Sequence, residues 1–459
     1  MSSADFHFVG MGGIGMSALA RLALANGSTV SGCDVKDSPL LRALRNEGAR
    51  VFIGHSGEHV AFAREIVVTS AVDVKSEEVV SARDAGIPVT SRGALLARFV
   101  DARQGIAICG THGKTTTTAM THAALRGGNI DAGLALGGID VALKTNAVVG
   151  SSALFVTEAD ESDGSFALLH PKIAVLTNLE EDHVSDAGEM ERLVASFRTF
   201  FSLLPDDGHA VIGVDNARSA EIARLSRRAS TITFGFSESA DLRATQIECA
   251  GLGSSFDMEL RGKSQGRVHL RVPGRINIEN ALAAIAVAHS VGVPFDHIAA
   301  GLATFTGVRR RFDVLVASAR AIVVDDYAHH PTAIRETIAA ARTYHQGPIV
   351  VAFQPHRYSR TSYLAKEFTE SLRDADTLYL APIYAASEEP IEGISVRTIG
   401  DPLLHEGRDV RYVDDVRALP DLLAHEAPHG SLILMLGAGN ITDAAAHLAT
   451  SLAAQDTFA

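Results

Sequence analysis

The stretch from Gly105 to Thr118, Gly-Ile-Ala-Ile-Cys-Gly-Thr-His-Gly-Lys-Thr-Thr-Thr-Thr, constrains the fold more than any other part of the chain. Four apolar and mostly β-favouring residues precede a glycine turn, and a helix-compatible run follows it. This is the strand, loop and helix order of a phosphate-binding loop. Backbone amides at such a loop point towards phosphate oxygens, and both the helix dipole and a lysine favour negative charge there. The stretch therefore predicts an ATP site.

The loop departs from the generic Gly-x-x-x-x-Gly-Lys-Thr pattern, because Ile108 stands where that pattern has glycine. A glycine turn with an exposed lysine is the alternative interpretation, and the preceding strand and the run of threonines argue against it. The charge of Lys114 suits phosphate, and a threonine hydroxyl can bind Mg²⁺. The residues expected at the ATP phosphates are Gly110, Thr111, His112, Gly113, Lys114, Thr115 and Thr116.

Length and charge narrow the range of partners. A chain of 459 residues, 46% hydrophobic and 21% charged, is long enough for about three globular domains. A net charge of -13 argues against broad nucleic-acid binding and attachment to an anionic membrane, so we expect small-molecule partners. Cys33, Cys109 and Cys249 are too far apart in sequence for a disulfide framework or a CxxC metal site. Without a basic signal region or a membrane-spanning apolar run, the chain is predicted to be cytoplasmic.

A second glycine loop lies near the N-terminus. A short strand leads into Gly10-x-Gly12-x-x-Gly15, a helix over 16–26 follows, and the next strand ends at Asp34. This is the dinucleotide fingerprint, with an acid placed for a ribose hydroxyl, although the same loop can hold any nucleotide diphosphate. With further strands at 66–69 and 88–90, it predicts a Rossmann-like unit over residues 1–103. Three polar residues of this unit are expected to be solvated: His55, His59 and Arg92.

Two apolar runs after the phosphate loop end in polar residues. The run 153–157 leads into Glu158-Ala-Asp-Glu-Ser-Asp163, and the run 173–177 into Asn178-Leu-Glu-Glu-Asp-His183. Because ligands of open α/β sheets lie beyond the carboxyl ends of strands, both clusters are expected to converge on the phosphate loop. Mg²⁺ prefers few carboxylates plus phosphate oxygens, which favours one ligand such as Glu158 over a cage of acids. Solvated acidic loops are the alternative.

Two asparagines precede an alanine-rich helix predicted over 281–291. Asn277 and Asn280 lie three residues apart, so their amides could contact adenine, or Asn277 could cap the helix. The preceding segment, 190–270, contains shorter β-like pieces and no predicted site.

The basic link Arg309-Arg-Arg311 leads into a third unit, in which four apolar strands end in polar loops after residues 324, 353, 381 and 436. Strands and helices alternate there, which predicts a nucleotide-fold-like sheet. His329 and His330 are expected to be hydrogen-bonded loop residues rather than metal ligands, since adjacent histidines alone do not make a metal site.

Together, these motifs resemble those of the Mur ligases, the amino-acid ligases of peptidoglycan synthesis. The resemblance spans nearly the whole chain and is carried by Gly-Met-Gly-Gly-Ile-Gly-Met-Ser (10–17), Gly-Thr-His-Gly-Lys-Thr-Thr (110–116), Glu-Ala-Asp-Glu-Ser-Asp (158–163), Asp-Asp-Tyr-Ala-His-His-Pro (325–331) and Phe-Gln-Pro-His-Arg-Tyr-Ser-Arg-Thr (353–361). It implies an α/β protein with a Rossmann-like UDP-sugar domain (1–103), a central P-loop-type ATPase domain (104–310) and a Rossmann-like amino-acid domain (311–459). The implied activity is ATP-dependent ligation of L-alanine to the carboxylate of UDP-N-acetylmuramate through an acyl phosphate, by a monomer or homodimer.

The resemblance also implies roles for individual residues. The implied catalytic residues are Lys114, Glu158 and His183, and the implied Mg²⁺ ligands are Thr115, Glu158 and His183. Further ATP contacts are implied at Asn277, Asn280, Asp326 and one arginine of 309–311, which we take as Arg310. The UDP-sugar contacts would be Gly10, Gly12, Gly13, Ile14, Gly15 and Asp34. The L-alanine contacts would be Tyr327, His356, Arg357 and Arg360, where an arginine pair can grip one carboxylate.

One departure and three alternatives accompany this resemblance. The family usually has Gly-x-His-Asn before its adenine-binding asparagine, and here Ile276 replaces that histidine. The recycling ligase that adds a tripeptide to UDP-N-acetylmuramate has tyrosine where this chain has Ser162. An NAD-dependent dehydrogenase would explain the N-terminal fingerprint but would leave Lys114 and its surroundings without a purpose. A non-catalytic nucleotide sensor is disfavoured by the intact set of Lys114, Glu158 and His183.

Overall fold

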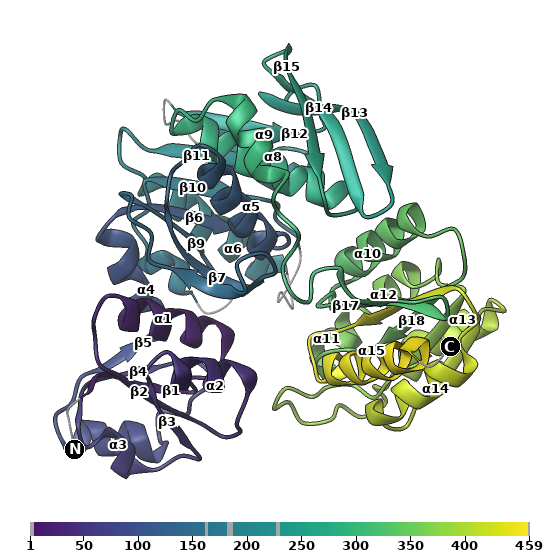
Figure 1. Ribbon diagram of the computed structural model, residues 1–459, viewed down its shortest axis with the longest axis horizontal. Coiled ribbons are helices and arrows are strands. Elements are labelled where there is room, and N and C mark those ends of the chain that lie inside the picture. The colour runs from purple at the N-terminus through teal and green to yellow at the C-terminus, as the bar shows by residue number, and fades with distance from the viewer. Residues whose placement is uncertain (1–3, 161–163, 181–186, 226–229, 458–459) are drawn as a thin grey trace.

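The chain folds into three α/β domains, each built on its own β-sheet (Figure 1). The computed structural model describes residues 4–160, 164–180, 187–225 and 230–457. The sheets contain five, ten and six strands. Their central strands, such as Ile-Val-Val-Ala-Phe at 349–353, are apolar throughout because helices cover both faces of a parallel sheet. The predicted fold class is confirmed.

The N-terminal sheet has the order β3-β2-β1-β4-β5, and all its strand pairs are parallel. It is the Rossmann-like sheet that the glycine motif predicts, with the loop between β1 and α1 at its carboxyl edge. The elements are β1 (Ala4–Val9), α1 (Ile14–Ala25), β2 (Val30–Asp34), α2 (Pro39–Asn46), β3 (Arg50–Ile53), η1 (Gly57–Val60), β4 (Ala63–Val68), α3 (Glu77–Asp84), β5 (Val89–Ser91) and α4 (Arg92–Asp101).

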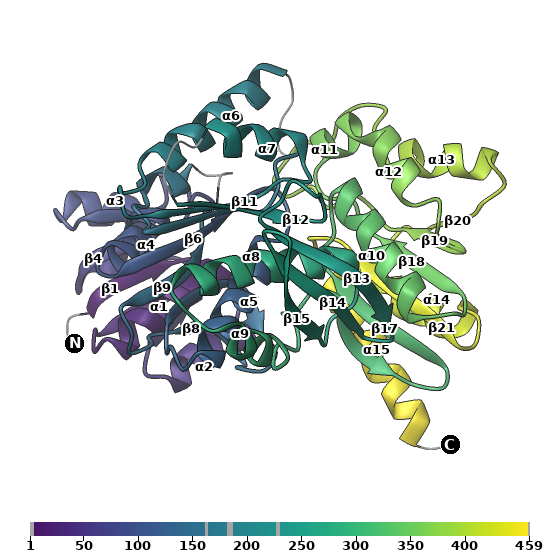
Figure 2. The ribbon, with the colours of Figure 1, turned by 90° about the horizontal axis from the view of Figure 1, so that it is seen from above.

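The central sheet has the order β15-β14-β13-β12-β11-β10-β6-β9-β7-β8, with β6 between β10 and β9 and parallel to both. The two acidic strand ends therefore flank the phosphate loop, as predicted. Helices α5, α8 and α9 cover one face, and α6 and α7 the other (Figure 2). The elements are β6 (Gln104–Cys109), α5 (Lys114–Gly127), β7 (Gly133–Asp140), β8 (Thr145–Val148), β9 (Leu154–Glu158), η2 (Ser165–Leu168), β10 (Ile173–Leu176), α6 (Ala187–Ser202), β11 (His209–Gly213), α7 (Ala217–Leu225), β12 (Thr231–Gly235), β13 (Leu242–Ala250), β14 (Gly253–Leu260), β15 (Lys263–Leu270), α8 (Arg275–Ser290) and α9 (Phe295–Leu302).

Two features of the central domain differ from, or add to, the sequence expectations. Helix α8 begins six residues before the predicted start at 281, and its N-cap is Gly274 at φ 94°, so Asn277 lies inside the first turn and does not cap the helix. The segment 190–270 is a sheet extension: after α6, β11, α7 and β12, the strands β13, β14 and β15 form an antiparallel meander.

The C-terminal sheet has the order β16-β17-β21-β18-β19-β20, with only β16 antiparallel to its neighbour. The four strands whose polar ends the sequence singled out, β17, β18, β19 and β21, are therefore contiguous. The elements are β16 (Asp313–Ala317), β17 (Ala321–Asp326), α10 (Pro331–Tyr344), β18 (Ile349–Phe353), α11 (Tyr358–Tyr363), α12 (Ala365–Ser371), β19 (Thr377–Leu380), α13 (Arg397–His405), β20 (Asp409–Tyr412), η3 (Val416–Ala418), α14 (Leu419–Glu426), β21 (Ser431–Leu436) and α15 (Ile441–Thr457).

The N-terminal and central domains share hydrophobic packing, whereas the C-terminal domain has its own. One cluster contains Phe8 and Leu19 of the first domain together with Phe155 and Phe197 of the second. The C-terminal sheet is covered by two separate clusters drawn entirely from its own residues. The first two domains are thus joined by a continuous core, which favours motion of the third domain against them.

The buried side chain of Asn146 ties β8 of the central domain to α1 of the N-terminal domain. Its amide nitrogen donates to the Ile14 carbonyl at 2.8 Å and to Ser17 Oγ at 2.9 Å. Its oxygen accepts from Arg21. Asn146 is 0% exposed, so these polar groups replace water at the interface.

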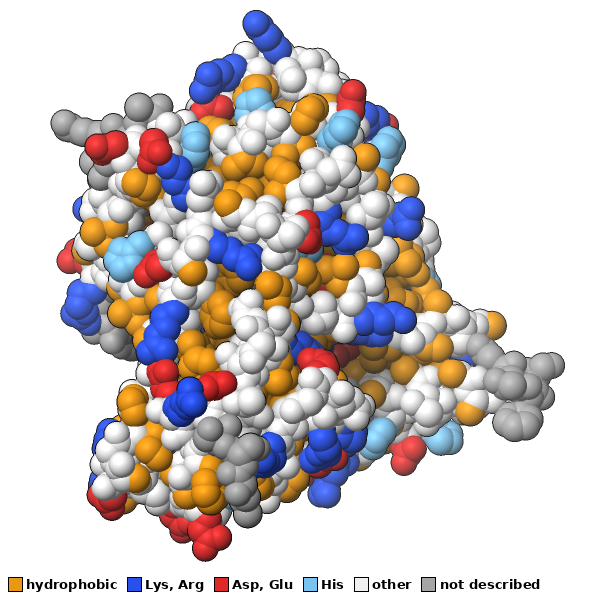
Figure 3. Space-filling view, turned by 60° about the vertical axis from the view of Figure 1, so that its left-hand side comes forward, with side chains coloured by type: hydrophobic (Ala, Val, Ile, Leu, Met, Phe, Trp, Pro, Cys, Tyr) orange, Lys and Arg blue, Asp and Glu red, His pale blue; other side chains and the backbone are white. Residues whose placement is uncertain are grey.

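The surface is mixed on the face shown in Figure 3, where the described Lys and Arg side chains are interspersed with acidic and apolar ones. Of the helices within the described ranges, none is both long and apolar enough to cross a membrane.

We predict that Asn146→Ala lowers the free energy of unfolding by about 1–3 kcal/mol, because the partners of the amide lose their hydrogen bonds while they stay buried. Urea unfolding of the full chain, followed through the transition of its first two domains, measures the change. The exposed Asn46→Ala is the control and should shift stability by less than about 0.5 kcal/mol. Equal effects of the two substitutions would contradict the assigned role of Asn146.

Candidate active site

The phosphate loop connects β6 to α5 in a conformation that requires glycine at two positions. Gly110 and Gly113 have φ of 124° and 83°, which L side chains rarely adopt. A Cβ at Gly110 would lie 2.3 Å from Thr177 Oγ1, and one at Gly113 would lie 2.3 Å from Asn280 Oδ1. The backbone is therefore packed directly against polar side chains just after β10 and on α8, and the first amides of α5 face outward at its N-terminus.

The end of β10 fixes the loop backbone through hydrogen bonds. Asn178 accepts from the Thr111 amide at its carbonyl (3.0 Å) and from the His112 amide at Oδ1 (2.9 Å). Thr177 Oγ1 donates to the His112 carbonyl at 2.6 Å. These residues were expected to lie near the loop as part of an acidic cluster; their contribution is to hold it.

Lys114, Thr115 and Glu158 come together beside the loop. Lys114 Nζ donates to the Gly110 carbonyl at 2.6 Å, while Thr115 Oγ1 donates to Glu158 Oε2 at 2.9 Å. The amide of Gly137 donates to the other oxygen, Oε1, at 2.6 Å. Burial raises the pKa of Glu158, and the Gly137 amide, Thr115, Arg311 and Lys114 oppose that rise. A hydroxyl and a carboxylate oxygen this close can hold a hard cation.

His183, the third implied metal ligand and catalytic residue, lies outside the described residues, as do the acids Glu161, Asp163, Glu181 and Asp182.

A cleft opens between the phosphate loop and the C-terminal domain. Its lining includes His112, Gly113, Thr115 and Thr116 from the loop region, Pro273, Ile276, Asn277 and Asn280 from the start of α8, Phe305 and Val308 from the link, and Arg311, Phe312, Asp326, Glu336, Thr337 and Ala340 from the third domain. Its walls combine apolar side chains with many polar ones, so they can contact both an apolar ring face and polar groups of a small molecule.

The two asparagines of α8 differ in what they contact. Asn280 is 5% exposed, and its Oδ1 accepts from Thr117 Oγ1 at 3.1 Å. Its amide nitrogen lies 3.4 Å from Asn277 Oδ1. Asn277 donates to the Pro273 carbonyl at 2.7 Å. Asn280 thus positions the phosphate loop and its helix, while both residues line the cleft. Ile276 adds an apolar surface where a histidine was expected from the resemblance.

Of the consecutive arginines, Arg311 lines the cleft rather than Arg310. Arg310 Nη2 donates to the Gly437 carbonyl at 2.9 Å, and the guanidinium groups of Arg310 and Arg311 lie 4.9 and 5.0 Å from the Tyr327 ring centre. A role of Arg310 at the phosphates stays a prediction, while Arg311 is the arginine that the structure brings to the cleft.

Asp326 lies at the end of β17 on the opposite side of the cleft. Its oxygens accept the amides of Phe312 and Ala328, both at 2.7 Å. Burial raises its pKa to about 6, against the influence of Arg311 and these amides. The carboxylate is held by its own domain and presents an edge to the cleft.

The expected amino-acid residues gather at the carboxyl edge of the C-terminal sheet. The His356 ring stacks on Tyr384 at 5.5 Å between centres, and Arg360 Nη1 lies 3.5 Å from His356 Nδ1. His329 lies between Tyr327 and His356, at 5.0 and 6.1 Å from their rings.

The two arginines of this group differ. Arg360 is 7% exposed within α11. Arg357 is the N-cap of α11 at φ 73° and uses its amide to bond the Tyr384 carbonyl. The expectation that His329 is a hydrogen-bonded loop residue is confirmed, since its Nδ1 lies 2.9 Å from the Tyr327 carbonyl oxygen. Sequence reasoning did not single out Tyr384, for which the only signal was its place in a strand-end loop.

A direct contact links the phosphate loop to the third domain. The rings of His112 and His330 lie 4.8 Å apart, and His112 Nε2 is 3.3 Å from Glu180 Oε2. The same oxygen of Glu180 accepts from Thr332 Oγ1 at 2.7 Å. Its pKa is lowered to about 2, because the bonds and charges of His112, Thr332 and His330 outweigh burial. These contacts connect the phosphate loop directly to the third domain.

The N-terminal glycine loop is a separate site in the first domain. Its amides at Gly10 and Met11 donate to the Cys33 carbonyl, and that of Gly12 to Asp34 Oδ2 at 2.8 Å. Asp34 also accepts the Val35 amide, so it braces the loop, and its contact with a ribose stays a prediction. A Cβ at Gly15 would lie 3.2 Å from Arg92 Cδ, so Arg92, expected to be merely solvated, lies against the start of α1.

Three family models match consecutive segments of the chain. The Mur ligase family catalytic domain matches residues 5–104, the Mur ligase middle domain 108–288 and the Mur ligase glutamate ligase domain 310–439. The chain belongs to the Mur ligase family. The three matched segments contain, in order, the N-terminal glycine loop, the phosphate loop and the Arg360 group. Mur ligases are ATP-dependent, which agrees with the phosphate loop.

Individual relatives match over almost their full length. UDP-N-acetylmuramate-L-alanine ligases of Geobacter sulfurreducens and Geotalea uraniireducens are 45% and 43% identical, each over 95% of both chains. Among solved Mur ligases, the UDP-N-acetylmuramate-alanine ligase of Thermotoga maritima is 27% identical with a TM-score of 0.84, covering 98% of this chain and all of that one. A murein peptide ligase of Psychrobacter arcticus has a TM-score of 0.75 at 24% identity and covers 98% of this chain and 99% of its own, a likeness of fold.

One acid on α8 has a strongly raised pKa, and the effect of this shift on stability is testable. Burial raises the pKa of Glu279 on α8 to about 8 from its usual 4.5, and the charges of Asp215, Glu336 and Glu180 reinforce the rise. Between these values the folded chain holds a proton that the unfolded chain has lost, so stability falls as pH rises through this window.

We therefore predict that Glu279→Gln stabilises the protein against heat above pH ~8 and has little effect below pH ~4.5. Thermal unfolding measured across this range gives the difference. Glu370→Gln, at an exposed position on α12, is the control. A constant difference between variant and wild type at all pH values would contradict the shifted pKa.

Proposed function

We propose that the protein joins L-alanine to the carboxylate of UDP-N-acetylmuramate, using ATP, in the synthesis of peptidoglycan precursors. The observation that carries this proposal is full-length identity of 43–45% to ligases of that name, over 95% of both chains. The geometry supports it, since a phosphate loop, a nucleoside cleft and an arginine-histidine group occupy the positions that such a reaction needs. The substrates are soluble, which suits a cytoplasmic enzyme.

In this proposal the ATP phosphates bind the amides of residues 110–116 at the start of α5. Lys114 leaves the Gly110 carbonyl and pairs with the β and γ phosphates, and Arg311 approaches from the other side of the cleft. The adenosine occupies the cleft between Asn277, Asn280 and Asp326. The isoleucine at 276 packs against the base without a hydrogen bond.

The oxygen donors Thr115 Oγ1 and Glu158 fit Mg²⁺, which prefers a few protein oxygens together with phosphate and water. His183 is the further proposed ligand from the family resemblance. A bound Mg²⁺ would supply charge neutralisation at the phosphate oxygens. Cation binding would displace the Thr115 proton from its bond to Glu158, and the raised pKa of Glu158 would fall as the carboxylate gains a positive neighbour.

The UDP-sugar is assigned to the first domain, with its diphosphate at the start of α1. The loop residues Gly10, Gly12, Gly13, Ile14 and Gly15 provide the approach, and Arg92 is placed to add a positive charge. Asp34 serves by bracing the Gly12 amide. The shared core with the central domain then fixes the sugar relative to the phosphate loop.

L-alanine is assigned to the edge of the third domain, at Tyr327, His356, Arg357 and Arg360. Arg360 is mostly buried beside aromatic rings, so its guanidinium can grip a carboxylate away from water. His112, Glu180 and His330 connect this domain to the phosphate loop.

The chemistry needs no protein nucleophile. The muramate carboxylate attacks the γ-phosphorus, the bond to ADP breaks, and an acyl phosphate forms. The amine of alanine then attacks the acyl carbon, phosphate leaves and the nitrogen loses a proton to solvent or phosphate. Lys114 and Arg311 stabilise the charge that develops on the transferring group, and closure of the third domain excludes water from the acyl phosphate.

ADP release tests the function directly. With UDP-N-acetylmuramate and ATP present, addition of L-alanine should support turnover. In the reaction without any amino acid, only a trace of ADP should be released. Turnover with a tripeptide, and not with L-alanine, would favour the alternative from the sequence analysis, the recycling ligase. Ser162, which distinguishes the two motifs, lies outside the described residues.

Lys114→Ala should abolish ADP formation while UDP-sugar binding survives, because the two sites lie in different domains. Removing a charge from the transferring phosphoryl group costs roughly 3 kcal/mol or more of transition-state stabilisation. Steady-state ADP release and calorimetry with the UDP-sugar measure the two effects. Lys366→Ala, at an exposed site on α12, should behave as wild type. Near-normal turnover of Lys114→Ala would end the assignment of this loop to ATP.

Arg360→Lys should raise the apparent KM for L-alanine more than that for ATP, since lysine keeps the charge but loses the planar fork. The two constants are measured by varying one substrate at saturation of the others. Arg373→Lys, in an exposed ion pair with Glu406, is the matched control. A raised KM for ATP with an unchanged KM for alanine would move Arg360 to the phosphates.

A further inference from the structure

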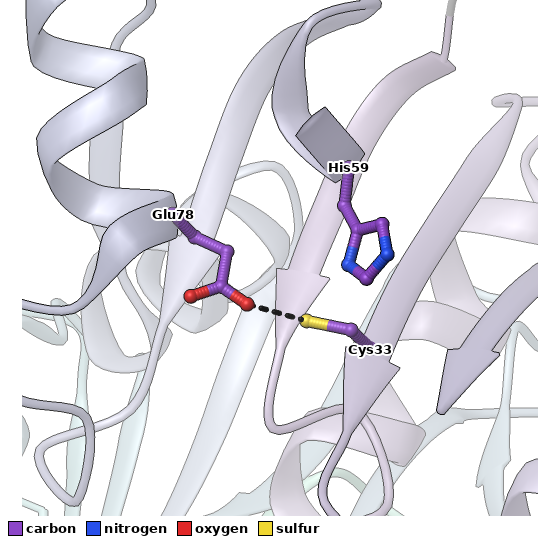
Figure 4. A group of neighbouring side chains, drawn as sticks. All are labelled: Cys33, His59 and Glu78. Carbon is purple, nitrogen blue, oxygen red and sulfur yellow. Dashed lines mark hydrogen bonds between the residues drawn. The ribbon is translucent and has the colours of Figure 1, made fainter. Parts of the chain in front are cut away.

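A second cluster of polar side chains lies in the N-terminal domain. Cys33 at the end of β2, His59 in η1 and Glu78 in the first turn of α3 turn towards one another (Figure 4). One ligand-type atom from each lies within 4.8 Å of the other two. Cys33 Sγ is 3.4 Å from Glu78 Oε1. Sequence spacing excluded only a metal site of the CxxC type, and here the fold brings Cys33 close to residues that are distant in sequence. His59, which was expected to be solvated, is only partly exposed.

The cluster is buried and has polar atoms without partners. Cys33 and Glu78 are 0% exposed. Among the described residues, Glu78 Oε2 and His59 Nδ1 are buried and make no hydrogen bond. His7 on β1 is also 0% exposed, with an unpartnered Nε2. A buried polar atom without a partner costs about 1–3 kcal/mol, so several such atoms in neighbouring side chains indicate that a ligand completes some of their interactions.

We propose that Cys33, His59 and Glu78 bind a thiophilic divalent cation, for which Zn²⁺ is the best match. Sulfur, imidazole and carboxylate are its preferred ligands, and three of them leave the fourth tetrahedral position for water. Mg²⁺ selects oxygen and is not expected here. Neighbouring ligand atoms in a tetrahedral zinc site lie about 3.5 Å apart, so the group closes by a small movement of the partly exposed His59.

Neighbouring residues orient the ligands. His55 Nδ1 lies 2.7 Å from Glu78 Oε1, and the Ser56 amide donates to the same oxygen at 3.1 Å. Oε1 is the oxygen that faces Cys33, so these two contacts hold the carboxylate with that oxygen towards the sulfur. The His59 ring stacks on Phe52 at 4.3 Å and 14°. Such outer contacts fix the geometry of metal ligands.

The electrostatics allow a cation to enter. Burial lowers the pKa of His7 to about 4, so this neighbour is neutral and does not repel it. Zinc binds the thiolate, so metal binding would displace the proton of the Cys33 thiol.

Cobalt and zinc titrations of the full-length protein, stripped of metal with a chelator, test the site. One equivalent of Co²⁺ should produce a thiolate-to-cobalt charge-transfer band and the visible bands of a tetrahedral ion, and Zn²⁺ should bleach both. Cys33→Ser should abolish the charge-transfer band and weaken Zn²⁺ binding at least about tenfold. Cys249→Ser, at a partly exposed cysteine on β13, should leave both unchanged.

His59→Gln is a second test of the site, because Cys33→Ser changes a buried residue and could misfold, whereas His59 is partly exposed. With a wild-type circular dichroism spectrum, it should keep the charge-transfer band and weaken Zn²⁺ binding at least about tenfold. Three results would overturn the proposal: absence of the band in the wild type, its survival in Cys33→Ser, or unchanged affinity in His59→Gln.

Discussion

The close approach of the phosphate loop to α8 is the contact on which the rest of the site depends. Asn280 Oδ1 would lie 2.3 Å from any Cβ at position 113 and accepts from Thr117 at 3.1 Å. The loop and its helix are therefore pressed against a second helix, not merely attached to a strand. Asn178 and Thr177 hold the other side of the loop. With both sides fixed, the amides of α5 are oriented before phosphate binds, which lowers the reorganisation needed at the moment of reaction.

The domains are joined unequally, and this inequality suits a reaction with a water-sensitive intermediate. A common apolar cluster and the buried Asn146 join the first two domains. The third domain meets the loop through polar contacts at Glu180, His112 and Thr332. Polar contacts exchange with water at small net free-energy cost, whereas separating an apolar core exposes its surface. In the proposed function, this arrangement would keep the sugar fixed relative to ATP while the third domain moves.

Several acidic side chains lie in or near the cleft and have raised pKa values. Asp326 lines the cleft, is buried and has a pKa raised to about 6, that of the partly buried Glu158 is also raised, and that of Glu279 on α8 is raised to about 8. Adding a triphosphate and a carboxylate substrate to these acids requires positive charge, which Lys114 and Arg311 supply in part. The need for further positive charge is the physical reason for proposing a divalent cation beside Thr115 and Glu158. The softer cluster at Cys33 differs in its ligand chemistry and would select a different metal.

The sequence by itself determined the fold class, both glycine loops and the convergence of strand ends on the phosphate loop. These follow from local rules, since glycine, apolar runs and strand polarity act within a few residues, and parallel strands place their ends at one edge. Several features were decided only by tertiary structure: that Arg311 and not Arg310 faces the cleft, that Asp34 braces its loop, and that Arg92 lies beside Gly15. The same holds for the meeting of Cys33, His59 and Glu78. Side-chain direction and partners far apart in the chain depend on how elements pack, and one-dimensional spacing carries no information about that packing.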